Sequence, residues 1–239
     1  MLTLDSILDI QLYQHKSGYR FSADAVLLAS FVDMPRVKKI ADFGAGSGVI
    51  GILLAKKYLS ADVKLIELQE SLVKLAEKNV ILNHLDERVK VVHADIKGLK
   101  LGSLHSYDLV VSNPPFRKTR TGLVSPSGEK AVARHELNLS ISALMKSALT
   151  MLKHHGRLCM IHLPERLAEV MESMRQYYLE PKRLRFVHSN AGSEAKMVFI
   201  EAVKEGRTGL KVERPLYLYD DNGDYTDEVR AIYGRPQGF

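Results

Sequence analysis

The feature that most constrains the fold is a regular alternation of strand-like and helix-like segments between residues 39 and 111. Four short apolar runs have the length of buried strands, at 39–43, 63–67, 89–95 and 107–111. Two segments between them have the apolar spacing of helices, at 49–58 and 71–83. Strands and helices that alternate with short connections are typical of a parallel sheet covered on both faces. The sequence therefore predicts an α/β fold.

The flanking segments are less regular. Ser22 is a candidate N-cap for a helix that ends near Val32, and residues 3–13 have the weak amphipathic pattern of a short helix. Beyond residue 136 the pattern predicts helices at 137–152 and 164–178 and strands at 157–163, 184–188 and 196–203. We therefore expect one domain in three parts: a helical extension (1–34) that forms part of the substrate or cofactor site, a core (35–203) and an irregular tail (204–239) packed on the core.

Composition narrows the class of protein. The 239 residues are 46% hydrophobic and 26% charged, which is typical of a globular protein. The net charge of +6 favours a polyanionic partner. The single cysteine, Cys159, lies in an apolar run and is expected to be a core residue. No membrane-spanning run, signal-peptide pattern or metal-ligand spacing of histidines is present, so we expect a cytoplasmic protein without a metal.

A glycine-rich turn, Asp42-Phe43-Gly44-Ala45-Gly46-Ser47-Gly48, joins the first predicted strand to the first predicted helix of the core. Glycines there let the backbone approach a ligand, and the N-terminus of the helix favours polar or anionic groups. Residues 46–51 also satisfy the pattern G-x-G-x-x-G, with Glu67 near the distance expected for a ribose-binding acid. A nicotinamide-dependent dehydrogenase is therefore one interpretation.

Three carboxylates favour a different cofactor, S-adenosylmethionine. Asp42 suits a cationic amino-acid group but would repel a pyrophosphate. Glu67 ends the second strand, where it can accept both ribose hydroxyls, and Asp95 ends the third, where it can accept from an adenine amino group. Each carboxylate alone has a structural alternative as a cap or an ion-pair partner. Their occurrence at successive strand ends beside the glycine turn favours the methyl donor. Gly44, Gly46 and Gly48 are then expected to bind it together with the three carboxylates.

The fourth strand ends in Ser112-Asn113-Pro114-Pro115-Phe116. The two prolines make a stiff turn that lacks N–H donors, and Asn113 Oδ1 with the Pro114 carbonyl can accept both hydrogens of a planar amino group. Phe116 can stack on the ring that carries this amine. The alternative is that the prolines only end a strand and that Phe116 belongs to the core.

With these residues the chain resembles the class I S-adenosylmethionine-dependent methyltransferases. The resemblance implies a Rossmann-like, seven-stranded and mostly parallel sheet with the last strand antiparallel and helices on both faces. Asn113-Pro114-Pro115-Phe116 matches the tetrapeptide of amino-group methyltransferases, which implies catalytic roles for these four residues. Such enzymes act on N6 of adenine, N4 of cytosine, N2 of guanine or the glutamine side chain.

A narrower resemblance points to bacterial enzymes that methylate N6 of adenosine 37 beside the anticodon of a valine tRNA. It rests on residues 19–25, 133–136 and the tail at 215–234. It implies a tRNA anticodon loop as partner, without a membrane or an obligate protein partner. The expected substrate-binding residues are Phe21, Arg117, Lys118, Arg120, Lys130 and Arg134.

Basic residues nearer the C-terminus are a possible extension of this surface: Lys182, Arg183, Arg185, Lys204, Arg207, Lys211 and Arg214. A merely solvated face is the alternative for each cluster. Other functions that stay open are guanine-N2 methylation of ribosomal RNA, glutamine-N5 methylation of a protein, and a non-catalytic RNA-binding protein with an inherited fold.

Overall fold

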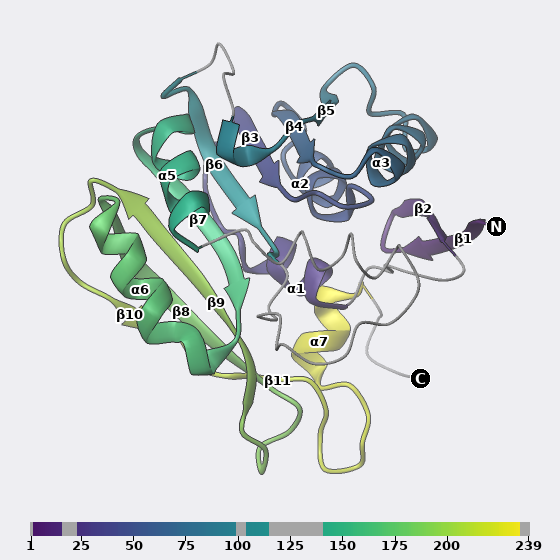
Figure 1. The fold of residues 1–239 in the computed structure, drawn as a ribbon. Helices are drawn as coiled ribbons and strands as arrows, with labels where there is room; N and C mark the ends of the chain where they lie inside the picture. Colours follow the sequence, from purple (N-terminus) through teal and green to yellow (C-terminus); the bar gives the residue numbers. More distant parts are fainter. Residues whose placement is uncertain (1, 16–22, 99–103, 115–140, 235–239) are drawn as a thin grey trace, which may run out of the picture.

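One large sheet runs through the molecule, and all but one of its long strands point the same way (Figure 1). The computed structural model describes residues 2–15, 23–98, 104–114 and 141–234. In spatial order the strands are β10 (Lys211–Val212), β8 (Leu179–His188), β9 (Ala195–Lys204), β7 (Leu152–His162), β6 (Tyr107–Ser112), β3 (Lys39–Phe43), β4 (Asp62–Glu67) and β5 (Val89–His93). The short β11 (Leu216–Tyr217) pairs with β8.

Seven of these strands form the predicted sheet, and β9, the last of them in the chain, is antiparallel to both β7 and β8. The predicted class I fold is therefore confirmed. Two very short strands from the tail, β10 and β11, add to its β8 edge.

Helices cover both faces of the sheet, as predicted. They are α1 (Ala23–Phe31), α2 (Val49–Lys57), α3 (Glu70–Leu82), α5 (Ile141–Met151), α6 (Leu167–Gln176) and α7 (Asp227–Ile232), with 3-10 turns η1 (Ile96–Gly98) and η2 (Pro164–Arg166). Successive strand residues enter different cores: Ile40 packs with α1 and α2, whereas its neighbour Ala41 packs with α5 and α6. Because both faces are buried, the central strands read as continuous apolar runs.

The N-terminal segment differs from its prediction. Residues 3–13 belong to a β-hairpin of β1 (Leu2–Ile7) and β2 (Ile10–His15), so the predicted short helix is wrong. Side chains alternate between more and less exposed along β1, and Ile10 and Leu12 are buried on either side of exposed Gln11. This period of two residues is that of a strand. The predicted helical extension 1–34 therefore holds a hairpin followed by α1.

The tail also contains more structure than predicted. Besides β10 and β11 it forms α7, whose N-cap Thr226 accepts a hydrogen bond from the Val229 N–H. Tyr225 stacks between Tyr219 and Tyr233, with ring centroids 5.3 and 5.6 Å away. Leu216 and Val229 are buried in the core, so the tail packs on the rest of the domain. The three-part division of the chain stays a prediction.

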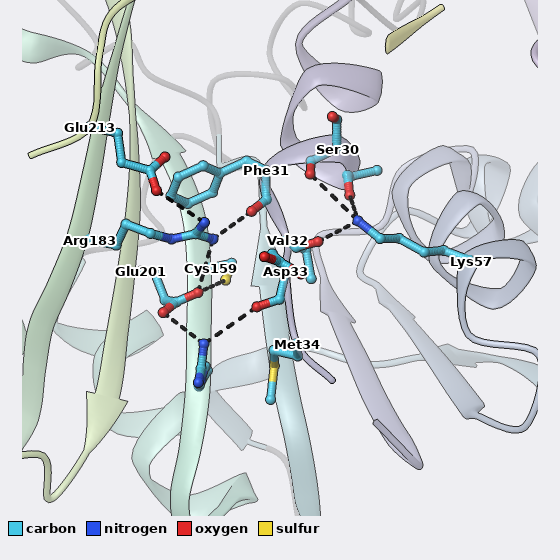
Figure 2. Close-up of polar contacts among 12 residues, drawn as sticks. Ser30, Phe31, Val32, Asp33, Met34, Lys57, Cys159, Arg183, Glu201 and Glu213 are labelled. Carbon is cyan, nitrogen blue, oxygen red and sulfur yellow. Dashed lines mark hydrogen bonds and ion pairs between the residues drawn. The ribbon is translucent and has the colours of Figure 1, made fainter. Parts of the chain in front are cut away.

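Basic side chains from α2 and β8 hold the C-terminal end of α1 (Figure 2). Lys57 Nζ donates to the carbonyls of Ala29, Ser30 and Val32. Arg183 donates to the Phe31 carbonyl at 2.6 Å and lies over the Phe31 ring, 4.1 Å from its centroid. These carbonyls have no partner within the helix, and cations favour the negative end of its dipole.

Glu201 in β9 balances this positive charge. Its carboxylate is buried and bridges two arginines, at 3.0 Å from Arg157 and 3.1 Å from Arg183 (Figure 2). The Cys159 thiol lies 3.8 Å from the same carboxylate, and burial raises the pKa of this thiol. Cys159 is therefore a core residue, as predicted, and the cluster joins α1 to the sheet.

Candidate functional site

The predicted site residues converge because the parallel strands end at one edge of the sheet. Phe43 at the end of β3 pairs with Ile66 of β4 on one side and with Ser112 of β6 on the other. The strand order therefore reverses at β3. In open α/β sheets, ligands bind in the crevice at such a switch point, beyond the carboxyl ends of the strands.

The glycine turn lies at this switch point and needs its glycines. Gly44 and Gly48 have φ angles of +69° and +89°, in the left-handed region that side chains disfavour. A Cβ atom on Gly44 would meet nothing within 4 Å, so the backbone is open on that side. A Cβ atom on Gly48 would instead lie 3.0 Å from Leu65 Cδ1. The turn is therefore packed against β4 at Gly48 and bare where a ligand would approach Gly44.

Asp42 lies buried beneath this turn. Its Oδ2 accepts a hydrogen bond from the Gly51 N–H at 3.0 Å, whereas its Oδ1 is buried without a partner among the described residues. The pKa of Asp42 is raised to about 7, mainly by burial, while the Gly51 N–H lowers it and the charge of Glu67 adds a smaller raising effect. A nearby cation would stabilise the ionised carboxylate. The unpartnered oxygen thus fits a donor that carries a cationic amino group.

Glu67 joins the two turns that would surround the donor. Its Oε2 accepts from the Gly46 N–H at 2.7 Å, and its Oε1 accepts from the N–H groups of Leu68 and Gln69 at 2.8 and 2.9 Å. The buried carboxylate therefore fixes the backbone after both β3 and β4. The predicted contact with ribose hydroxyls stays a prediction, and it requires Glu67 to share or give up one of these bonds.

Asp95 lies two residues beyond the end of β5 and is exposed. Its Oδ1 accepts from the Lys97 N–H at 2.9 Å, which caps η1. The preceding Ala94 N–H donates to the Glu67 carbonyl at 3.0 Å, so this turn lies beside the end of β4. The predicted contact of Asp95 with adenine stays a prediction.

The Asn113–Pro114 segment is held beside the glycine turn. Ser112 Oγ, which is buried, donates to the Phe43 carbonyl at 3.0 Å and so ties the end of β6 to the residue before Gly44. Asn113 is half-buried and Pro114 is buried. The remaining predicted site residues lie outside the described residues: Phe21, Pro115, Phe116, Arg117, Lys118, Arg120, Lys130 and Arg134.

Three of the seven residues in the proposed C-terminal extension of the basic surface, Arg183, Arg185 and Lys204, make internal contacts instead, whereas Arg207, Lys211 and Arg214 are exposed and stay a prediction. Arg183 pairs with Glu201 and Glu213, and Arg185 pairs with Glu228 at 2.7 Å. Lys204 is buried, and its Nζ donates to carbonyls at the end of α5. Positive charge on these residues holds the tail and helices on the sheet.

One residue near the site was missed. Asn79 in α3 is fully buried, and its Nδ2 donates to the Ser47 carbonyl in the glycine turn at 2.9 Å. The signal that could have found it is the pair Asn79 and Asn83, spaced i, i+4 on the same side of a helix as buried Ala76 and Val80.

A glycine turn at the switch point, a carboxylate at the end of β4 and another just beyond β5, and an Asn-Pro segment after β6 together have the layout of a class I methyltransferase. The chain belongs to the methyltransferase small domain family, whose model matches residues 17–180. It is an S-adenosylmethionine-dependent methyltransferase. This membership argues against the dehydrogenase interpretation of the G-x-G-x-x-G pattern.

Relatives in several bacteria share much of the sequence. A protein of Flavobacteriaceae bacterium (strain 3519-10) is 30% identical over 189 residues, which cover 79% of this chain and 78% of the relative. A protein of Pedobacter heparinus is 31% identical over 215 residues, which cover 89% and 88%. Both relatives are named tRNA1(Val) (adenine(37)-N6)-methyltransferase.

Solved structures share the fold. A predicted O-methyltransferase from Agrobacterium tumefaciens superposes with a TM-score of 0.71 at 21% identity, over 90% of this chain and 97% of that chain. Geranyl diphosphate methyltransferase in complex with S-adenosylmethionine has a TM-score of 0.57 at 11% identity, over 76% of this chain and 84% of that chain. Within the described ranges, no helix is long and apolar enough to cross a membrane, and no group of three or more metal-ligating side chains is found.

Proposed function

We propose that this enzyme methylates N6 of adenosine 37 beside the anticodon of a valine tRNA. The observation that carries the proposal is the position of Asn113, which lies next to the glycine turn at the switch point. The relatives of this chain are named for the same reaction. An exocyclic amine needs two acceptors in one plane, which the Asn113 side chain and the Pro114 carbonyl would supply.

S-adenosylmethionine supplies an electrophilic methyl group on a sulfonium centre. Asp42 would face its cationic amino group, and Glu67 and Asp95 its ribose and adenine. The lone pair of the target amine is delocalised into the adenine ring. Hydrogen bonds to Asn113 Oδ1 and the Pro114 carbonyl localise electron density on the nitrogen as it pyramidalises. The nitrogen–carbon bond forms as the carbon–sulfur bond breaks, and one amino proton leaves to solvent.

Single-stranded RNA suits this arrangement. Bases in an anticodon loop can be splayed out of the stack, and Phe116 would then hold the target base by stacking. The net charge of +6 and the predicted basic residues Arg117, Lys118 and Arg120 favour contact with phosphates. A cytoplasmic location and action without an obligate protein partner belong to the same proposal.

The test is to incubate the purified enzyme with labelled S-adenosylmethionine and total RNA from a strain that lacks it, and then to identify the labelled nucleoside. Label in N6-methyladenosine of one tRNA supports the proposal. Label in N2-methylguanosine of ribosomal RNA, or in a protein glutamine when cell extract is added, overturns it.

A further inference from the structure

The N-terminal hairpin docks on α3 through two asparagine side chains. Asn79 Oδ1 accepts from the Tyr13 N–H at 2.7 Å, and its Nδ2 donates to the Tyr13 carbonyl at 3.2 Å. One turn later, Asn83 makes the same pair of bonds to Gln11, at 3.0 and 2.7 Å. Four helical residues rise about 6 Å and two strand residues about 6.8 Å, so the two amides match the free edge of β2. The two asparagine side chains thus make the backbone hydrogen bonds that a neighbouring strand would otherwise make to β2.

Of the two asparagines, only Asn79 also makes a hydrogen bond to the glycine turn. The bond from its Nδ2 to the Ser47 carbonyl uses the second amide hydrogen, so all of its polar groups are engaged. The same Ser47–Gly48 peptide is held on its other side, where the Gly48 N–H donates to the Ala45 carbonyl at 2.9 Å. The orientation of this peptide sets the direction of the backbone that enters α2.

We propose that Asn79 is a positioning residue for the methyl donor, and that it couples docking of the N-terminal hairpin to the geometry of the glycine turn. The side-chain amide of Asn79 bonds both Tyr13 at the edge of β2 and the Ser47 carbonyl. When the hairpin is undocked, this amide is free to rotate, and the Ser47 carbonyl loses its partner. Coupling between two sites is reciprocal. Donor binding therefore stabilises the docked hairpin, and the docked hairpin strengthens donor binding.

The experiment compares Asn79→Ala with Asn83→Ala in the full chain, using calorimetric titration with S-adenosylhomocysteine. Both variants lose bonds to the hairpin, but only Asn79→Ala loses the bond to Ser47. We expect the dissociation constant to rise on the order of tenfold for Asn79→Ala and less than about twofold for Asn83→Ala. Turnover at saturating donor should stay close to wild type, with the loss confined to KM for the donor. Equal effects in the two variants, or an unchanged constant for Asn79→Ala, overturn the proposal.

Hydrogen exchange in the wild-type protein is a second measurement, needed if Asn79→Ala does not fold. Saturating S-adenosylhomocysteine should slow exchange of the Tyr13 amide at least threefold, while the Val229 amide at the start of α7 exchanges as before. An unchanged Tyr13 rate overturns the coupling. Neither the calorimetric titration nor the hydrogen exchange uses RNA, so the outcome of these two measurements is independent of which amine the enzyme methylates.

Discussion

Replacing Glu201 with alanine tests how α1 is held on the sheet. Glu201 is 4% exposed and pairs with Arg157 and Arg183 through its two oxygens. Removing one partner of a buried ion pair costs roughly 3–5 kcal/mol, because the remaining charge stays buried without compensation. Arg183 keeps its bond to the Phe31 carbonyl, and Arg157, about one third exposed, regains some water. The lower end, about 3 kcal/mol, is therefore the expected loss in free energy of unfolding.

The assay is urea unfolding at pH 7, with thermal unfolding beside it. For a domain of this size, a loss of about 3 kcal/mol should lower the melting temperature by roughly 6–12 °C. Glu213→Ala is the matched control, because Glu213 also pairs with Arg183 but is 21% exposed and 3.4 Å away. The free energy of unfolding of Glu213→Ala should fall by less than about 1 kcal/mol. If Glu201→Ala loses no more than Glu213→Ala, the buried cluster does not hold α1 as argued.

Three further predictions concern the candidate site. Asn113→Ala should abolish methyl transfer while the calorimetric affinity for S-adenosylhomocysteine stays near wild type; turnover near the wild-type rate would contradict the acceptor role. Phe116→Leu should reduce kcat/KM for RNA without changing donor affinity, and an unchanged value would remove the stacking role. The pKa of Asp42 rises from its ordinary 3.8 to about 7 in the folded protein, so the donor-free enzyme loses stability as pH rises from about 4 to about 7. This loss is on the order of 4 kcal/mol. Urea unfolding at pH 5 and pH 8 should show a smaller change in the free energy of unfolding for Asp42→Asn than for wild type. An equal change in the two proteins would refute this.

The sequence alone determined the alternating core and the edge where the site lies. Strands such as Lys39–Phe43 and Tyr107–Ser112 are buried on both faces, so they appear as continuous apolar runs that need no knowledge of their neighbours. Parallel strands then bring Asp42, Glu67 and Asn113 to one edge by topology.

Only the tertiary structure decided which groups these side chains contact. The predicted strand at 184–188 begins five residues earlier, at Leu179, and includes the charged Arg183, because Glu201 and Glu213 from distant segments neutralise that charge. Glu67 binds backbone amides of two turns that folding brings together. The hairpin is held by Asn79 and Asn83 across more than sixty residues of chain. Such contacts depend on long-range geometry, which local periodicity does not encode.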